Sequence, residues 1–384
     1  MIRLIKNADI YAPEHIGKKD ILIADEKICA IEDCIEPSGI PGLEVYDLEG
    51  KKLLPGYIDL HVHITGGGGE LGPSSRVPES FLTAFTTNGI TTVLGLLGTD
   101  GITRSMENLV TKARALTEEG ITAYCLTSSY AYPPVTMTGK VEKDIMMLDP
   151  VIGVKLAVSD HRSNNPSGED LIDLATDARR GGLLSGKAGL VTMHMGTGKG
   201  MLDPILYALD HSDVPIKNFL PTLMARSHAL MDQGVELVRR GGYIDFTASS
   251  EYAGLEKMVK TLHYVLDQEG VTTDHVSISS DAFGSQPKFN AKGECIGLTY
   301  ASPEFLHKTI KALVKDGMEL TTAIKLLTTT PATLIAKEGI KGCVRVGADA
   351  DLLVLDDELN ITSLFARGKV AVWNHEIRMK GRFE

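Results

Sequence analysis

The chain lacks the features that direct a protein to a membrane or a nucleic acid. Its 384 residues contain no apolar run of about 18 residues, the length that spans a bilayer. Basic residues are outnumbered, and the net charge of −11 argues against a nucleic acid or an anionic membrane as partner. The first ten residues lack the long apolar stretch of a signal peptide. We therefore expect neither class of partner.

Cysteine is also scarce and scattered. No pair among the five cysteines has zinc-finger spacing, and an odd number does not suggest a disulfide framework. Reduced thiols are typical of the cytoplasm, so we expect a cytoplasmic protein. Internal repeats and low-complexity tracts are absent from the sequence as well.

Short strand-like runs, separated by turn residues, occur at both ends of the chain. They are residues 4–10, 20–24, 27–31, 350–355, 363–370 and 370–374. We predict that residues 1–54 and 345–384 together form one small β domain, a β-sandwich. Two unrelated β extensions are the alternative.

Between these ends, apolar strand-like runs alternate with helical stretches. Eight such runs begin near residues 57, 90, 121, 151, 190, 218, 243 and 275. Met106–Glu119 and Leu171–Arg180 are two of the expected helices. Eight strand–helix units predict an α/β fold, a (β/α)8 TIM-like barrel over residues 55–344. A doubly wound open sheet with fewer strands is the alternative.

The sequence Leu-Pro-Gly-Tyr-Ile-Asp-Leu-His-Val-His ends with His61 and His63. On a strand, the odd-numbered residues Tyr57–His63 would share one face and the even-numbered residues Ile58–Val62 the other. Two imidazoles on one face can bind a metal ion, although two polar residues leaving a strand for solvent are an equal alternative. The glycines Gly66–Gly69 and the acidic residue after them favour a binding loop.

Active-site groups of a barrel project from the carboxyl ends of its strands. Those ends carry His61, His63, Lys155, His194 and Asp281. Each has an ordinary alternative: a lysine can extend to the surface, a histidine can be a hydrogen-bonded core residue, and an aspartate can cap a helix. Their joint position at one mouth of the barrel favours a metal-dependent active site.

Lys155 lies among apolar strand residues, where an ammonium group is costly and cannot bind a metal. Two forms of the side chain resolve this. It can be a neutral amine that forms a Schiff base, as in some barrel aldolases, or a carbamate whose two oxygens bridge two metals. The nearby histidines favour the carbamate, because an aldolase does not need them.

With these residues in place, the chain resembles the bacterial isoaspartyl dipeptidases of the amidohydrolase superfamily over nearly its whole length. The stretches that carry the resemblance are residues 61–73, 93–100, 139–144, 151–155, 159–163, 194–196 and 279–287. The resemblance implies hydrolysis of the β-aspartyl bond of isoaspartyl dipeptides, and it implies a homo-oligomer.

The resemblance also implies the metal ligands and the general base. His61, His63 and Asp281 would bind one zinc ion. A carbamate on Lys155 would bridge to a second zinc ion, held also by His194. Asp281 would take a proton from the metal-bound hydroxide as it attacks the amide, and would then give it to the leaving amine.

A further set of residues is implied in substrate binding. Glu70 would receive the α-amino group, and Tyr130 would hydrogen-bond the carbonyl oxygen as it becomes an oxyanion. Arg162 and Arg226 would hold the two carboxylates. Without the resemblance, these charges would be read as ordinary loop and surface residues. The full set is Gly68, Gly69, Glu70, Thr99, Tyr130, Arg162, Arg226 and Ser285.

One position departs from the family. A metal-binding histidine follows Pro-Thr at the end of the family's sixth strand, whereas this chain has Leu223 after Thr222. The second metal is therefore short of an imidazole, unless the loop folds back and brings His228 into its place. Two rival functions stay open: another amidohydrolase reaction, such as cyclic amide hydrolysis or deamination, and a metal-depleted relative that binds acidic dipeptides without turnover.

Two glycine-containing stretches resemble nucleotide-binding motifs. Gly181–Ala188 matches a P-loop except that Ala188 replaces the Ser or Thr that would hold magnesium. Gly196–Gly200 has the wrong spacing for a dinucleotide fingerprint. We expect neither stretch to bind a nucleotide.

Overall fold

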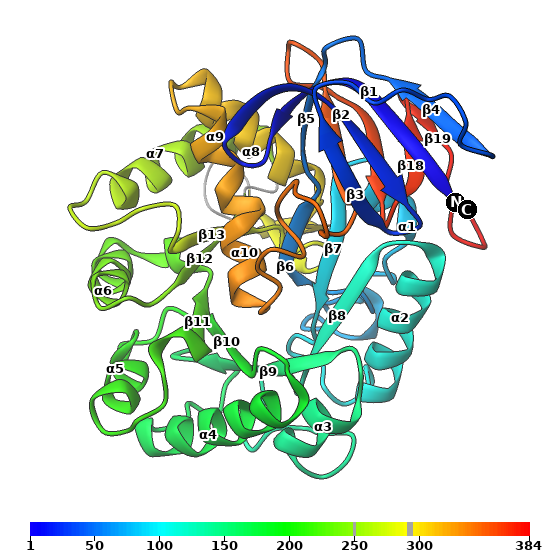
Figure 1. The fold of residues 1–384 in the computed structure, drawn as a ribbon. Helices are drawn as coiled ribbons and strands as arrows, with labels where there is room; N and C mark the ends of the chain where they lie inside the picture. The colour runs from blue at the N-terminus through cyan, green and yellow to red at the C-terminus, as the bar shows by residue number, and fades with distance from the viewer. Residues whose placement is uncertain (249–250, 290–294) are drawn as a thin grey trace.

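Parallel strands form a barrel at the centre of the molecule, and helices surround it (Figure 1). A computed structural model describes residues 1–248, 251–289 and 295–384. A six-stranded and a two-stranded parallel sheet make the wall of the barrel. These strands are β6 (Tyr57–Val62), β7 (Ile90–Gly95), β8 (Thr122–Thr127), β9 (Val151–Val158), β10 (Leu190–Met195), β11 (Phe219–Thr222), β12 (Ile244–Thr247) and β13 (Val276–Ser279).

The two sheets meet at both of their edges, which closes the barrel. β11 lies beside β12. At the other junction the backbone N–H of His63 donates to the carbonyl oxygen of Ala282 at 2.9 Å, and Val62 forms a bridge with Ala282. The (β/α)8 barrel predicted from the alternation of strands and helices is confirmed. This closure also places the ends of β6 and β13 side by side.

A helix follows each barrel strand. The helices are α1 (Leu82–Thr86), α2 (Met106–Glu119), α3 (Val141–Met147), α4 (Gly168–Ser185), α5 (Asp203–Asp210), α6 (His228–Arg239), α7 (Leu255–Leu266), α8 (Glu304–Lys315), α9 (Leu320–Ala323) and α10 (Thr329–Leu334). Short 3-10 turns are η1 (Pro73–Ser75), η2 (Ile216–Asn218), η3 (Met224–Arg226), η4 (Tyr252–Gly254) and η5 (Ile324–Leu327). A hairpin of β14 (Ser285–Phe289) and β15 (Cys295–Tyr300) precedes α8.

The predicted helix Met106–Glu119 has the observed limits of α2, and its caps explain them. The side chain of Ser105 accepts a hydrogen bond from the backbone N–H of Asn108, which satisfies a donor in the first turn. Gly120 ends the helix with a φ of 134°, a conformation that glycine adopts without strain.

The strict alternation predicted for β6 is interrupted. Ile58 and Leu60 pack in a core cluster that includes α10, but Val62 packs with Tyr57 in the larger cluster between strands and helices. The register of β6 against β7 shifts after Tyr57 and again between Asp59 and Val62. Because each shift changes the face on which later residues lie, the period of two does not hold along the whole strand.

Both ends of the chain join one nine-stranded sheet beside the barrel, as predicted for the second domain (Figure 1). Antiparallel pairing of β5 with β16 connects the two halves. The strands are β1 (Ile2–Tyr11), β2 (His15–Ala24), β3 (Lys27–Glu32), β4 (Leu43–Asp47), β5 (Lys52–Pro55), β16 (Leu352–Leu355), β17 (Ile361–Ala366), β18 (Lys369–Trp373) and β19 (Glu376–Ile377). The predicted domain limits at 54/55 and 344/345 stay predictions.

The single strand predicted over residues 363–370 is wrong. β17 ends at Ala366 and β18 begins at Lys369, and the two strands pair antiparallel. Arg367 and Gly368 form the turn with φ values of 48° and 71°. Two successive positive φ angles are typical of the tight turn that joins a β-hairpin.

The P-loop-like stretch Gly181–Ala188 ends a helix, whereas a P-loop begins one. α4 stops at Ser185, and Gly186 caps it with a φ of 66°. Nζ of Lys187 donates to the carbonyl oxygens of Ile145 at 2.6 Å and Leu148 at 2.8 Å. Lys187 thus binds the last carbonyls of α3, a position where a cation is stabilising.

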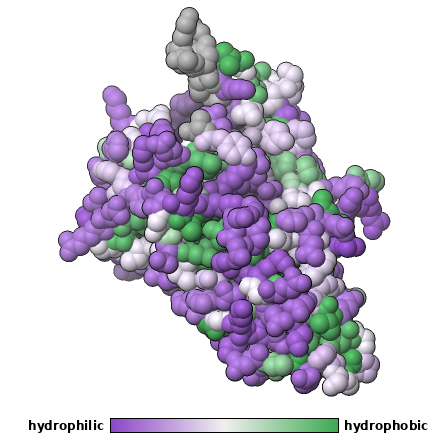
Figure 2. Space-filling view, turned by 90° about the horizontal axis from the view of Figure 1, so that it is seen from above, coloured by the Kyte–Doolittle hydropathy of each residue, from purple (hydrophilic) through white to green (hydrophobic). Residues whose placement is uncertain are grey.

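Figure 2 shows a face on which hydrophilic residues predominate and hydrophobic ones are visible between them in separate patches. Among the helices that the structure describes, none is long and apolar enough to span a bilayer.

Candidate active site

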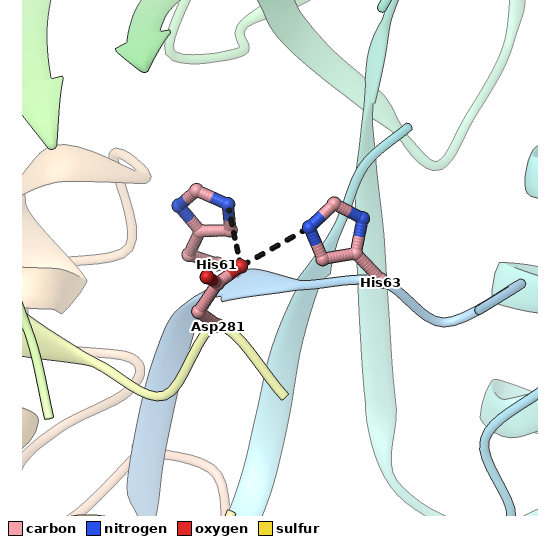
Figure 3. Close-up of side chains that lie close together, drawn as sticks. All are labelled: His61, His63 and Asp281. Carbon is pink, nitrogen blue, oxygen red and sulfur yellow. Dashed lines mark hydrogen bonds and ion pairs between the residues drawn. The ribbon is translucent and has the colours of Figure 1, made fainter. Parts of the chain in front are cut away.

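His61, His63 and Asp281 bring their side chains together where β6 and β13 end (Figure 3). Oδ1 of Asp281 lies 3.3 Å from Nε2 of His61 and 3.1 Å from Nε2 of His63. The three candidate ligand atoms all lie within 4.8 Å of one another. Two imidazoles and one carboxylate are a usual part of a zinc site. We refer to these three residues as the metal group.

Burial and mutual contact set the charges of the metal group. Burial lowers the pKa of His61 well below its ordinary value, so its imidazole is neutral, the form that binds a metal. Burial alone would raise the pKa of Asp281, but the facing histidines outweigh it and lower that pKa. Nε2 of His61 and Nδ1 of His63 have no hydrogen-bond partner within the described part of the chain. The metal group therefore fits a divalent cation.

Lys155, on β9, is completely buried near this group. Burial lowers the pKa of its amine to about 7, and the negative charges of Asp281 and Asp245 offset only part of this effect. In residues 1–248, 251–289 and 295–384, Nζ of Lys155 finds no hydrogen-bond partner. A neutral, unpartnered amine can react with carbon dioxide, so this environment fits the expected carbamate.

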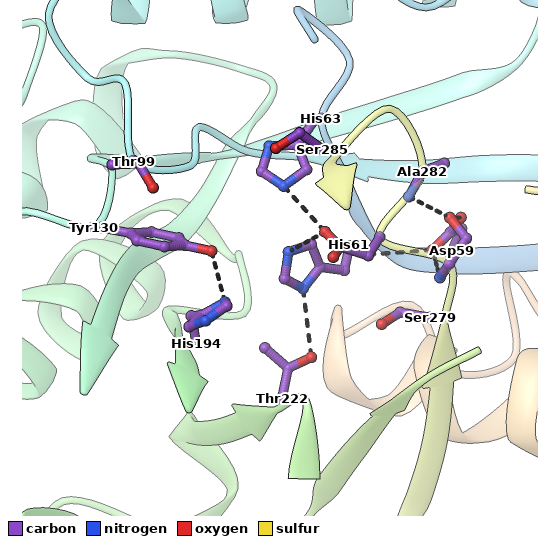
Figure 4. A network of polar contacts seen from close by, with 12 residues as sticks. Asp59, His61, His63, Thr99, Tyr130, His194, Thr222, Ser279, Ala282 and Ser285 are labelled. Atoms are coloured by element: carbon purple, nitrogen blue, oxygen red, sulfur yellow. Dashed lines mark hydrogen bonds and ion pairs between the residues drawn. The ribbon is translucent and has the colours of Figure 1, made fainter. Parts of the chain in front are cut away.

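His194 stands apart from the metal group, with both ring nitrogens already in contact with other side chains. Nδ1 lies 2.6 Å from the hydroxyl of Tyr130 (Figure 4). Nε2 lies 3.1 Å from Nη2 of Arg162 and 3.4 Å from Oδ2 of Asp160. These contacts use the atoms that a second metal would need.

Leu223 and His228 do not supply a further ligand. Leu223 lines the cavity next to the metal group and has a positive φ of 63°. His228 lies on the first turn of α6, exposed, with its ring against Tyr264 at 4.8 Å between centroids. The loop therefore does not fold back, and His228 does not take the place of the imidazole that is missing at position 223. Among residues 1–248, 251–289 and 295–384, the side chains therefore fit one metal ion but not a second.

A cavity of about 500 Å³ opens beside the metal group. The sequence-predicted residues in its lining are His63, Gly68, Glu70, Thr99, Tyr130, Arg162, His194, Arg226, Asp281 and Ser285. Gly69 borders an adjoining hollow instead. His61 and Lys155 lie deeper, because both are buried and neither is part of this lining.

Glu70 is held on three sides within this cavity. Its Oε1 accepts a hydrogen bond from Thr99 at 3.0 Å, and its Oε2 accepts one from Ser285 at 3.2 Å. Nη1 of Arg162 lies 3.5 Å from Oε1. The carboxylate and the guanidinium group thus present opposite charges to one space, as a zwitterionic ligand requires.

Asp160 is a site residue that the sequence analysis missed. It binds Arg162 through two contacts, from Nε at 2.9 Å and from Nη2 at 3.0 Å. Burial would raise the pKa of Asp160, but hydrogen bonds from His194 and Arg162 outweigh it and lower that pKa. The available signal was an acidic residue two positions after a buried strand.

The second nucleotide-like stretch supports the same loop. A Cβ atom at Gly196 would clash with the backbone of Ser159 and Asp160, and one at Gly198 would clash with Ser159. These glycines therefore allow the chain after β10 to approach the loop that carries Asp160 closely. Their role is packing, which explains why their spacing does not match a dinucleotide fingerprint.

Known proteins share this architecture. The model of the Amidohydrolase family matches residues 189–372. The β-aspartyl dipeptidase of Fervidobacterium islandicum AW-1, solved with β-Asp-Leu, is 40% identical, with a TM-score of 0.90 over 98% of this chain and 99% of that chain. The dihydropyrimidinase of Brevibacillus agri NCHU1002 shares the fold, at 17% identity and a TM-score of 0.68 over 99% of this chain and 97% of that one. A dihydroorotase of Staphylococcus aureus (strain MRSA252) is 33% identical over 107 residues, which span 28% of this chain and 24% of the dihydroorotase.

Proposed function

Because the chain belongs to the amidohydrolase superfamily and, within it, to the bacterial isoaspartyl (β-aspartyl) dipeptidases, we propose that it is a metal-dependent dipeptidase that cleaves the β-aspartyl bond of isoaspartyl dipeptides. One observation carries the proposal: the cavity combines the metal group with one carboxylate and two arginines. An isoaspartyl dipeptide offers a matching α-amino group and two carboxylates. The ligand seen in the Fervidobacterium structure, β-Asp-Leu, has this chemistry.

In the proposed complex, Glu70 binds the α-amino group, and Arg162 and Arg226 bind the two carboxylates. Asp160 holds the guanidinium group of Arg162 in place through its two contacts. Bidentate binding of this kind fixes a planar guanidinium group and aligns it with a carboxylate. Thr99 and Ser285 keep the carboxylate of Glu70 in the cavity.

Zinc is the proposed cofactor, held by His61, His63 and Asp281, with a carbamate on Lys155 as a further ligand. When bound, zinc supplies Lewis-acid activation of water and of the scissile carbonyl. Asp281 accepts the proton of the attacking water and passes it to the leaving amine, as its ionised state allows. Burial raises the pKa of Tyr130, so its hydroxyl keeps the proton that it donates to the developing oxyanion.

The proposal also includes a location in the cell and an oligomeric state. We assign the protein to the cytoplasm, which the free thiols of Cys29, Cys34, Cys125 and Cys343 support. We also expect a homo-oligomer, on the resemblance to the family alone.

The test is hydrolysis of β-Asp-Leu, α-Asp-Leu and dihydroorotate by one zinc-loaded sample whose metal content is measured. We expect turnover of β-Asp-Leu only. Turnover of dihydroorotate instead would favour a cyclic amide hydrolase.

Leu223 and the contacts of His194 favour one rival, a relative that binds dipeptides without turnover. Calorimetric binding of β-Asp-Leu by a metal-loaded sample that releases no leucine would establish this rival and reject the proposed enzyme.

A further inference from the structure

A buried carboxylate lies below the metal group, and the proposed reaction gives it no role. Asp245, in the middle of β12, is 1% exposed. The hydroxyls of Thr222, Ser277 and Ser279 each donate a hydrogen bond to it at 2.6 Å. Its donors thus come from the strands on either side, β11 and β13. We call these four residues the hydroxyl–carboxylate cluster.

Thr222 links the cluster to the metal group. Its Oγ1 lies 3.4 Å from Nδ1 of His61, directly below the imidazole ring (Figure 4). A threonine hydroxyl has one proton, and Asp245 takes it because a carboxylate only accepts. Toward His61 the Thr222 oxygen can therefore act only as an acceptor. Nδ1 of His61 must then carry the proton, and Nε2 presents its lone pair toward Asp281, 3.3 Å away.

Other contacts fix the backbone of His61, so the hydroxyl of Thr222 acts on the orientation of the imidazole ring alone. Asp59 accepts hydrogen bonds from the backbone N–H of His61 at 3.3 Å and of Ser280 at 3.0 Å. These contacts hold β6 against the segment that carries Asp281, but they do not touch the imidazole. Nδ1 of His63 has no comparable partner in the described ranges of the chain.

We propose that Asp245 and Thr222 are positioning residues that fix the tautomer and the ring orientation of His61 for metal binding. The inference rests on the proposed function only in taking the metal group as the zinc site. Groups that hydrogen-bond the second nitrogen of a ligating histidine commonly change metal affinity or activity 10–100-fold when they are removed.

The experiment measures the zinc dissociation constant by competition with a chromophoric chelator, and the visible spectrum of the cobalt(II) form. Thr222→Val removes the hydroxyl and keeps the shape of the side chain. We expect about 10–100-fold weaker zinc binding and a changed cobalt spectrum. Thr222→Ser keeps the hydroxyl, whereas Thr222→Ala removes it. We expect the Ser variant to bind zinc more tightly than the Ala variant and to have a cobalt spectrum closer to that of the wild type.

Thr91→Val is the matched control. Thr91 is a buried threonine on β7 whose hydroxyl has no partner among the described residues, and its side chain lies against Gly56, at the other end of β6. The Thr91→Val protein should bind zinc as the wild type does. Circular dichroism and the melting temperature establish that each variant is folded.

Each outcome decides a different point. A folded Thr222→Val that binds zinc within about twofold of the wild type overturns the inference, and so does equal binding by the Ser and Ala variants. If Thr222→Val does not fold, the comparison of zinc binding by Thr222→Ser and Thr222→Ala tests the inference by itself. A wild-type protein that binds no zinc rejects the metal group, and hence the proposed function, before any variant is compared.

Discussion

Glu70 is the residue whose charge we expect to select the substrate. Glu70→Gln keeps the side-chain volume and removes the negative charge that would pair with the α-amino group. Because Glu70 is exposed at the cavity and water screens its charge, we expect a loss below that of a buried pair, at most about 2 kcal/mol or roughly 30-fold in kcat/KM for β-Asp-Leu.

Glu14→Gln, in the exposed turn between β1 and β2, is the control and should have wild-type kinetics. Wild-type kcat/KM in Glu70→Gln would remove Glu70 from the substrate site.

Lys155 gives the metal-free protein a pH-dependent stability. Its pKa in the folded state is about 7, below the ordinary 10.5 of the unfolded chain, so between these values the unfolded state binds more protons. The free energy of unfolding should therefore rise with pH across this window, by at most about 1.4 kcal/mol per pH unit from this group. Below about pH 7 both states are protonated, and the contribution no longer changes with pH.

Urea unfolding of chelator-treated protein in CO2-free buffer, between pH 7.5 and about 9.5, measures this slope. We expect Lys155→Met to lose it and exposed Lys315→Met to keep it. Equal slopes in all three proteins would show that the Lys155 amine does not titrate in this window.

Among the elements, the turn from β11 to α6 decides the number of metal ions. Leu223 occupies a left-handed backbone position there, at a φ of 63°, which histidine adopts more readily than most residues. Leu223→His should therefore fold and supply the missing imidazole beside His194. We expect metal content after dialysis to rise from near one to near two ions per chain, since a zinc site usually needs three protein ligands.

Elemental analysis with protein quantification is the measurement, and Leu223→Gln is the control of similar size. Wild-type protein that keeps two ions through exhaustive dialysis would contradict the one-metal site.

Elements were predictable from the sequence where local signals agreed. α2 has its predicted limits because Ser105 and Gly120 cap it, and the barrel strands are short, mainly apolar runs. The hairpin of β17 and β18 was missed because Arg367 takes a positive φ that its residue type does not announce.

Site residues were predictable where they lie at a strand end, as His61 does, or just after one, as Asp281 does. Asp160 was not predicted although Arg162 is only two residues away, because its other partner, His194, is distant in the sequence. Asp245 was not predicted because all three of its hydrogen-bond donors are distant in the sequence. Asp245 takes hydrogen bonds from residues 222, 277 and 279, a set that only the closed barrel brings together. Its sole local signal was a charge in the middle of an apolar strand.

For the whole molecule, a buried ion pair lies where the barrel chain enters the β sheet. Nζ of Lys341 is 2.6 Å from Asp351 and 2.9 Å from Asp349, and Lys341 is 3% exposed. Lys341→Met leaves these carboxylates without their buried partner, which typically costs about 3–5 kcal/mol. Lys27 still reaches Asp349, so we expect the lower part of that range.

Chemical denaturation of Lys341→Met, compared with exposed Lys315→Met, tests this at fixed pH. An unchanged unfolding midpoint would show that water replaces the lysine at no cost.

Because β5 pairs with β16, the β sheet cannot be completed until the C-terminal end of the chain has been synthesised. Synthesis releases β1–β5 first, yet one edge of β5 stays open until residues 352–355 have been made. Six of the fourteen buried residues in the apolar core of this sheet, Leu352 and Phe365 among them, come from the C-terminal part of the chain and are also made late. An unpaired strand edge is a template for other chains, so a polypeptide stalled within the barrel should be captured by chaperones or aggregate, although most of its barrel is complete.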